Sequence, residues 1–155
     1  MTTSSEHPTV QLHPSGHVDG FARAQLPPAE QWPVITLEGV YAVPPRLNAA
    51  VELLDRAISE GHGDRVAIVV PDGIGGWEET TYAQLSAQVD ALAHVLVHDL
   101  GLVSGNRVLC RGFNGRFMTV AWLATLKAGM VAVTTMPMLR AGELRMVIER
   151  AQCNA

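Results

Sequence analysis

Two features in the second half of the sequence could carry chemistry: a glycine-containing turn and a lysine that ends an apolar helix. The turn is GFNGR (112–116), between a predicted strand and a predicted helix, where helix amide groups can bind a phosphate. It matches neither GxGxxG nor GxxxxGK[ST], and no acidic residue follows at the dinucleotide spacing. An ordinary strand-to-helix turn is therefore favoured. A second glycine segment, DGIGG (72–76), joins two predicted strands and is a weaker candidate still.

Lys127 is the candidate for a catalytic lysine. It stands in LKAG, in the last turn of the predicted helix that Gly129 ends, so its ammonium complements the negative end of the helix dipole. The sequence places no acidic residue beside it. A dipole partner is therefore favoured over a catalytic group.

Histidines and cysteines provide candidate metal ligands. His94 and His98 are four residues apart on the polar face of a predicted helix, in line with Asp90, but no Glu or Cys completes a site, so exposed surface residues are favoured. The other candidates are irregularly spaced or far apart, and they are His7, His13, His17, Cys110 and Cys153. The two cysteines form no CxxC pair and are predicted to be free thiols in a reducing compartment. The residues alone thus identify no catalytic, cofactor-binding or metal-binding residue.

The composition excludes several classes of protein. In 155 residues there are 11 Lys and Arg against 15 Asp and Glu, a net charge of −4, with the basic residues scattered. Nucleic acid is therefore not an expected partner. The first thirty residues hold no unbroken apolar run and no basic start, so we expect no secretory signal among them. No window approaches the length of apolar sequence that a membrane span requires, and we expect a cytoplasmic protein.

The elements that must position these residues begin after a polar segment. Residues 1–18 are predicted to be a disordered tail, because they contain too little apolar surface to offset the entropy of ordering. Prolines favour an extended course over residues 21–45, held down by Trp32, Ile35 and Leu37. A helix over 47–60 ending at Gly61 is predicted next.

The middle and end of the chain alternate strands with helices. A hairpin of residues 64–70 and 77–80 leads to a long helix, with Thr81 as N-cap and Gln84 as its capping-box partner. The units that follow are a strand at 107–111, an apolar helix at 117–128, a strand at 131–135 and an amphipathic helix at 142–150. Strand, buried helix, strand and helix predict an α/β fold with a parallel sheet and right-handed crossovers.

Taken together, these segments resemble the N-terminal part of the AMP-forming acyl-CoA and aryl-CoA ligases, within the adenylate-forming enzymes. The segments that carry the likeness are TYAQL (81–85), NRVLCRG (106–112), WLATLKAG (122–129) and TMPMLRAGEL (135–144). Two earlier segments resemble the 2-aminobenzoate branch, namely VDGFARAQLPPAEQWP (18–33) and LNAAVELLDR (47–56). The resemblance implies a partial N-terminal AMP-binding domain over residues 19–155.

The resemblance also implies a reaction. Family members attach a carboxylic acid, here one such as an aminobenzoate, to AMP and then to CoA, as acid–thiol ligases that use ATP, Mg²⁺ and CoA. Their phosphate loop, acidic motifs and distal lysine have no counterpart in these 155 residues. We therefore expect no bound cofactor, no site residue and no ligase activity from this chain alone. GFNGR and Met130 depart from the branch, which tends to carry a proline with paired asparagines and a small residue at these places.

Three interpretations remain open. The chain is a truncated piece of an aryl-CoA ligase, or it is one subunit of a split ligase whose partner fragment supplies the phosphate loop and lysine. Alternatively, it is a stand-alone α/β module that binds a small molecule at the carboxyl ends of its strands, near GFNGR.

Overall fold

The structure is a computed structural model that describes residues 13–33, 44 and 46–155. Its strands are β1 (Val66–Pro71), β2 (Trp77–Thr81), β3 (Arg107–Arg111) and β4 (Val131–Thr135). The α-helices are α1 (Phe21–Ala24), α2 (Tyr82–His94), α3 (Arg116–Lys127) and α4 (Ala141–Ala151). Shorter helical segments are the 3₁₀ turn η1 (Ala29–Gln31) and the π-helical η2 (Val51–Asp55), η3 (Ile58–His62) and η4 (Val95–Asp99).

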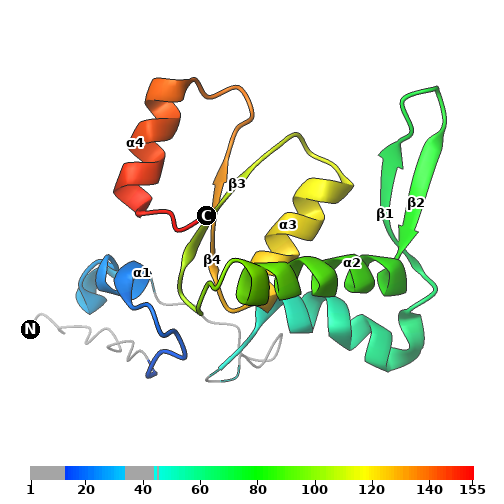
Figure 1. The fold of residues 1–155 in the computed structure, drawn as a ribbon. Coiled ribbons are helices and arrows are strands. Elements are labelled where there is room, and N and C mark those ends of the chain that lie inside the picture. Colours follow the sequence, from blue (N-terminus) through cyan, green and yellow to red (C-terminus); the bar gives the residue numbers. More distant parts are fainter. Residues whose placement is uncertain (1–12, 34–43, 45) are drawn as a thin grey trace, which may run out of the picture.

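The predicted α/β fold with a parallel sheet is confirmed. β3 and β4 pair in parallel, with Arg107 opposite Val131 and Arg111 opposite Thr135, and α3 forms the crossover between them. β1 and β2 pair antiparallel as the expected hairpin, and the hairpin forms a sheet of its own. Figure 1 shows α3 between the hairpin and the β3–β4 pair, with α2 crossing beneath it.

The core lies where α2 and α3 pack on each other and on β3. Thr81 starts α2 as predicted: its side chain accepts from the Gln84 amide at 3.3 Å, and the Gln84 side chain accepts from the Thr81 amide at 3.0 Å. The apolar stripe of α2 is then buried against α3 because both helices present small and branched side chains to one cluster. The buried members of this core cluster include Leu54, Leu85, Val89, Leu96, Val108, Val120, Leu123, Ala124 and Met130.

The segment before the core differs from its prediction. Instead of running extended throughout, it forms the short helical turns α1 and η1, and the Trp32 indole donates to the Pro27 carbonyl at 2.7 Å. Pro28 permits η1 because it stands just before this turn, at the N-cap, with φ of −52°, within the range that the proline ring fixes. Ile35 and Leu37 lie outside the described residues, as does most of the tail predicted to be disordered. Of that tail, residues 13–18 are described, and the Val18 amide donates to the Ser104 carbonyl at 3.1 Å.

Two further helices follow the sequence pattern. The helix predicted over 47–60 is present from about residue 49, and Gly61 has φ of +83°, a left-handed conformation that favours glycine. α4 forms as predicted, but none of its residues is buried, and Ile148 is 40% exposed. In the described part of the chain, no helix combines the length and apolar character that crossing a bilayer requires.

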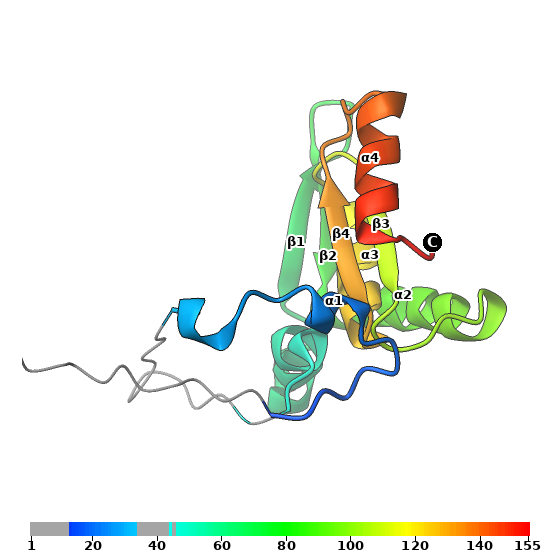
Figure 2. The ribbon, with the colours of Figure 1, turned by 90° about the vertical axis from the view of Figure 1, so that its left-hand side faces the viewer.

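Figure 2, turned by a quarter, shows α4 beside the β3–β4 pair. The C-terminal residues return to β3, where the Asn154 amide donates to the Arg107 carbonyl at 2.8 Å. This return is fixed by Arg107. Its guanidinium donates to the carbonyls of Ala151 at 3.0 Å and Gln152 at 2.8 Å, which are the last carbonyls of α4 and its cap. The end of α4 is therefore held at the start of β3 by charge-assisted hydrogen bonds.

Candidate functional site

The GFNGR turn lies where the sequence predicted it, between β3 and the first turn of α3. Gly115 is extended, with φ of 169°, and no side chain caps the helix. Its carbonyl accepts from both the amide and the hydroxyl of Thr119 at 3.1 Å. Arg116, which begins α3, forms an ion pair with Glu78 on β2. The arginine therefore ties the helix start to the hairpin.

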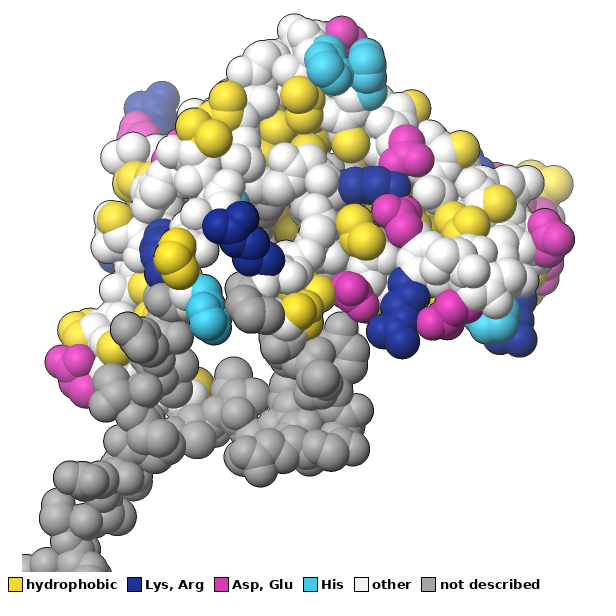
Figure 3. All heavy atoms as spheres, turned by 90° about the horizontal axis from the view of Figure 1, so that it is seen from below, with side chains coloured by type: hydrophobic (Ala, Val, Ile, Leu, Met, Phe, Trp, Pro, Cys, Tyr) yellow, Lys and Arg dark blue, Asp and Glu magenta, His cyan; other side chains and the backbone are white. Residues whose placement is uncertain are grey.

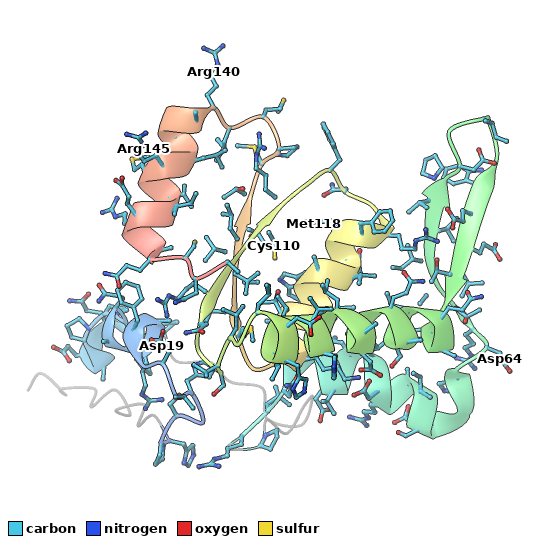
Figure 4. All side chains as sticks on the ribbon, viewed as in Figure 1. Asp19, Asp64, Cys110, Met118, Arg140 and Arg145 are labelled. Carbon is cyan, nitrogen blue, oxygen red and sulfur yellow. The ribbon has the colours of Figure 1, made fainter. Side chains whose placement is uncertain are left out.

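Two cavities flank this turn at the carboxyl ends of β3 and β4. The larger, of about 550 Å³, lies between β3, α2, η4 and α3. Its lining is mostly apolar and includes Leu92, Leu96, Val108, Cys110, Phe113, Phe117, Met118 and Ala121. Figure 4 shows Cys110 and Met118 in the space between β3 and α3. The second, of about 410 Å³, lies between the turn and the end of β4, beside Asn114, Thr135 and Pro137.

Cys110 is the nucleophilic side chain in the larger cavity. It is 4% exposed, and its Sγ lies 3.8 Å from the Thr125 hydroxyl. Burial raises the pKa of its thiol above the ordinary value, although the contact with Thr125 acts in the opposite direction. The thiol is therefore protonated at neutral pH and lacks the thiolate character of a catalytic cysteine. The cavity is therefore suited to binding apolar groups rather than to covalent catalysis by Cys110.

In the DGIGG turn, the side chain of the first residue, Asp72, is hydrogen-bonded to the backbone of the turn. The Asp72 carboxylate accepts from the amides of Ile74 at 2.9 Å and Gly76 at 2.8 Å. These bonds lower the pKa of Asp72 below its ordinary value. The amide groups that could hold a phosphate here already donate to a carboxylate, so this turn is a weak candidate for a phosphate site.

The surroundings of Lys127 differ from the prediction in one respect. The sequence placed no acidic residue beside it, but the fold brings two carboxylates to its ammonium. Its ammonium lies 2.8 Å from Asp55 Oδ1 and also pairs with Asp90 of α2. Burial by itself lowers the pKa of Lys127, but the two carboxylates outweigh it and the pKa is raised. The carbonyls of Leu126 and Lys127 each accept from the Asn48 side chain at 3.1 Å. Lys127 is therefore a junction between three helical segments.

A second ionic junction was missed by the sequence reasoning. Arg107, 5% exposed, pairs with Asp19 and lies 4.6 Å from the Phe21 ring, measured from its Cζ to the ring centroid. Asp19 also accepts from the Phe21 amide at 2.9 Å and from the Asn106 side chain at 2.9 Å. The Phe21 amide first, and Arg107 next, hold the pKa of Asp19 below its ordinary range. No local sequence pattern joins residues this far apart in the chain.

The remaining candidates lie apart from these groups. His94 and His98 are exposed, as predicted, with ring centroids 4.2 Å apart. Cys110 and Cys153 are both free. Among the residues that the structure describes, no three His, Cys, Asp or Glu side chains come together as a metal site.

Comparison with known proteins identifies the family. The profile of the AMP-binding enzyme family matches residues 54–155. The salicyl-AMP ligase / salicyl-S-ArCP synthetase of Mycobacterium tuberculosis is 34% identical over 137 residues, which cover 84% of this chain and 22% of that protein. An acetyl-coenzyme A synthetase of the same organism is 46% identical over 63 residues, covering 40% of this chain and 10% of the relative.

Solved structures resemble the fold as well. The crystal structure of CmiS6 is 34% identical with a TM-score of 0.61, covering 73% of this chain and 27% of that one. The structure of the anthranilate CoA ligase AuaEII in complex with anthranoyl-AMP has a TM-score of 0.63 at 22% identity. The match covers 72% of this chain and 20% of that one. This chain thus spans about a tenth to a quarter of the proteins it matches. Because the profile covers more than half of its residues, the chain belongs to the AMP-binding enzyme family.

Proposed function

We propose that this chain forms the first part of the AMP-forming domain of an aryl-acid ligase. The parent activity joins a carboxylic acid to AMP with ATP and Mg²⁺ and passes the acyl group to CoA. The observation that carries the formation of the acyl-AMP is the 34% identity to a salicyl-AMP ligase / salicyl-S-ArCP synthetase across most of this chain. CoA as the acceptor is supported by a 3-hydroxybenzoate–CoA ligase of Aromatoleum, which is 32% identical over 108 residues. In this proposal the chain supplies scaffold, and the groups that contact ATP come from later segments of the domain.

The proposed acid is an aromatic carboxylate, with 2-aminobenzoate as the specific candidate. A salicylate-activating relative supports the aromatic class. So does the 3-hydroxybenzoate–CoA ligase. The aminobenzoate branch rests on the resemblance of residues 18–33 and 47–56, since the anthranilate ligase is similar at the level of fold alone.

The groups on this chain support a scaffold role. Asp55 and Asp90 converge, but on the ammonium of Lys127, which already pairs with both carboxylates and would repel a second cation, so this place does not fit Mg²⁺. The DGIGG amides are occupied by Asp72, and the larger cavity beside GFNGR is mostly apolar. A triphosphate would need several cationic or amide donors directed at one point.

The test is complementation of a relative. The M. tuberculosis salicyl-AMP ligase would be divided after the segment that matches this chain, and its remainder would be co-expressed with this chain. The matched control is the ligase's own first segment with the same remainder. We expect salicylate-dependent exchange of pyrophosphate into ATP from both pairs and none from this chain alone. If the control pair is active and the pair with this chain is not, the proposal is wrong.

A stand-alone binding module is the second candidate, because two cavities flank GFNGR at the carboxyl ends of the strands. This candidate predicts that the isolated chain binds ATP or AMP at millimolar concentration or better. Isothermal titration would detect this binding. Loss of binding in Lys127→Met with the fold intact would assign the lysine to it; absence of binding to the unaltered chain would remove the candidate.

A further inference from the structure

The GFNGR turn contains an asparagine that is followed directly by glycine. The chain has four asparagines, all within the described residues, and they are Asn48, Asn106, Asn114 and Asn154. Only Asn114 precedes a glycine. This pairing matters chemically, because a glycine nitrogen has no neighbouring Cβ to hinder its attack on the side-chain carbon of the residue before it.

The side chains of the other three asparagines are held by hydrogen bonds. The Asn48 side chain donates to two carbonyls of α3, each at 3.1 Å. The Asn106 side chain donates to Asp19 at 2.9 Å, and the Asn154 side chain accepts from the Arg107 amide at 3.0 Å. Each of these side chains would have to break a bond of the fold before it could react with the following amide.

Asn114 has no such restraint. It is exposed, and no described residue is hydrogen-bonded to its side chain or to the amide nitrogen of Gly115. A Cβ built on Gly115 would meet no atom within 4 Å, so the space around the glycine is open. The Gly115 amide also stands at the N-cap of α3, where the positive end of the helix dipole stabilises a nitrogen that has lost its proton.

The fold also restrains the two Asp–Gly pairs, at 19–20 and 72–73, which could form the same ring. The Asp19 carboxylate pairs with Arg107, and the Asp72 carboxylate accepts from the amides of Ile74 at 2.9 Å and Gly76 at 2.8 Å. Turning either carboxyl group toward the glycine that follows it would break these contacts. The pair at 114–115 is therefore the one that the fold leaves free to react.

We propose that Asn114 is a modification site, which deamidates spontaneously through a cyclic imide formed with Gly115. The Gly115 nitrogen loses its proton and bonds to Cγ of Asn114, while the Cγ–Nδ2 bond breaks and the side-chain nitrogen leaves as ammonia. Water then opens one of the two C–N bonds of the imide, which gives aspartate or isoaspartate at position 114. Each event consumes one water, releases one ammonia and oxidises nothing. This inference is independent of the proposed ligase function.

The product changes the charge of the GFNGR turn. One negative charge appears at the start of α3, a helix that has no side-chain cap, and beside the smaller cavity, which Asn114 lines. An anion is favourable at this end of a helix. The modification therefore puts a carboxylate where the turn could otherwise hold a phosphate, and a second anion would be repelled.

The test follows each asparagine of the purified chain during incubation at neutral pH. Peptide mapping by mass spectrometry detects the gain of about one mass unit, and labelling with an isoaspartyl methyltransferase detects isoaspartate. We expect Asn114 to convert at least tenfold faster than each of the other three asparagines, with the label located in the same peptide. Conversion of Asn114 at the rate of the others would overturn the proposal.

Two variants test the mechanism. Gly115→Ala is compatible with the fold, because φ of 169° is extended backbone and a Cβ has room, but its methyl group hinders ring closure. We expect Asn114 to convert at least tenfold more slowly in this variant. Asn114→Gln keeps a side-chain amide, but its ring would have six members and closes slowly, so the isoaspartate label should be lost. An undiminished rate in the first variant or an undiminished label in the second would overturn the proposal.

A further comparison needs no variant. In guanidinium chloride the unfolded chain frees Asn48, Asn106 and Asn154, so these three should deamidate faster than in the folded chain. The rate at Asn114 should change less than tenfold on unfolding, because the folded turn already leaves its side chain and the next amide free. Slowing of Asn114 by tenfold or more in the folded chain would overturn the proposal.

Discussion

At the scale of single residues, two ionic junctions hold distant parts of the chain together. Arg107 joins the segment before the core to β3 and to the end of α4, and Lys127 joins α3 to α2 and η2. Both cations are largely buried and have several oxygen partners. A buried charge of this kind is costly to leave unpaired, so losing one partner should have a larger effect than losing a surface ion pair.

Asp19→Asn should lower the stability of the isolated chain at neutral pH, because it removes the carboxylate that faces Arg107. The pKa of Asp19 is below its ordinary value in the folded state. Its contribution is therefore present above the unfolded pKa, near 3.8, and is lost as pH falls through the folded pKa. Urea midpoints measured at pH 7 and near pH 3 should show the gap between the two proteins narrowing in acid. A constant gap would contradict the ionic explanation.

Lys127→Met should cost about 1–2 kcal/mol of unfolding free energy, since the apolar stem is kept and the ammonium is lost. Arg56→Met is the matched control, because Arg56 pairs with Glu52 and Glu60 on the exposed surface, and its effect should be smaller. The raised pKa means that the contribution of Lys127 persists below the unfolded pKa, near 10.5, and disappears as pH rises through the folded value. Urea unfolding at pH 8 measures both variants; equal losses would contradict a buried junction.

At the scale of elements, α2 is the helix whose start the sequence specifies most fully. Its capping box satisfies two amides that the helix cannot satisfy internally. Thr81→Ala should therefore cost about 1 kcal/mol, whereas Thr81→Ser keeps the hydroxyl and should cost less. Thermal and urea unfolding would measure both, and a serine variant as unstable as the alanine variant would assign the loss to the methyl group instead.

α3 and α4 differ in how they are held. α3 buries Val120, Leu123, Ala124 and Thr125, while α4 buries none of its residues and is tied mainly through its C-terminal carbonyls to Arg107. Amides in α4 should therefore exchange with solvent at least tenfold faster than those in α3. Hydrogen exchange followed by mass spectrometry measures this difference. Equal protection would mean that α4 opens only with the core.

At the scale of the whole molecule, the face seen in Figure 3 is not marked by charge of one sign. On the face shown in Figure 3, Lys and Arg side chains lie among Asp and Glu side chains rather than in a patch of one sign. β3 is the more asymmetric feature: one of its edges is paired with β4, whereas among the described residues only 154 and 155 are hydrogen-bonded to the backbone of its other edge. The larger, mostly apolar cavity is lined by the same strand.

The order of strands and helices could be predicted because its signals are local. Thr81 with Gln84, Gly61 and Gly129, and the apolar stripe of α2 each act within a few residues, so the sequence contains them directly. Family membership followed from several such segments in a fixed order. The short turns α1 and η1 were not predicted, because the proline-rich composition fits both an extended course and a helical turn.

By itself, then, the sequence determined the α/β pattern, the hairpin, the helix caps and the likeness to the AMP-binding enzymes. Only the tertiary structure decided what Lys127 and Arg107 do, because their partners Asp55 and Asp19 are 72 and 88 residues away. It also decided which edge of β3 pairs with β4 and which receives residues 154 and 155. Local periodicity fixes which face of an element is apolar, whereas ion pairs and strand edges depend on how distant elements are brought together, and no short segment records that.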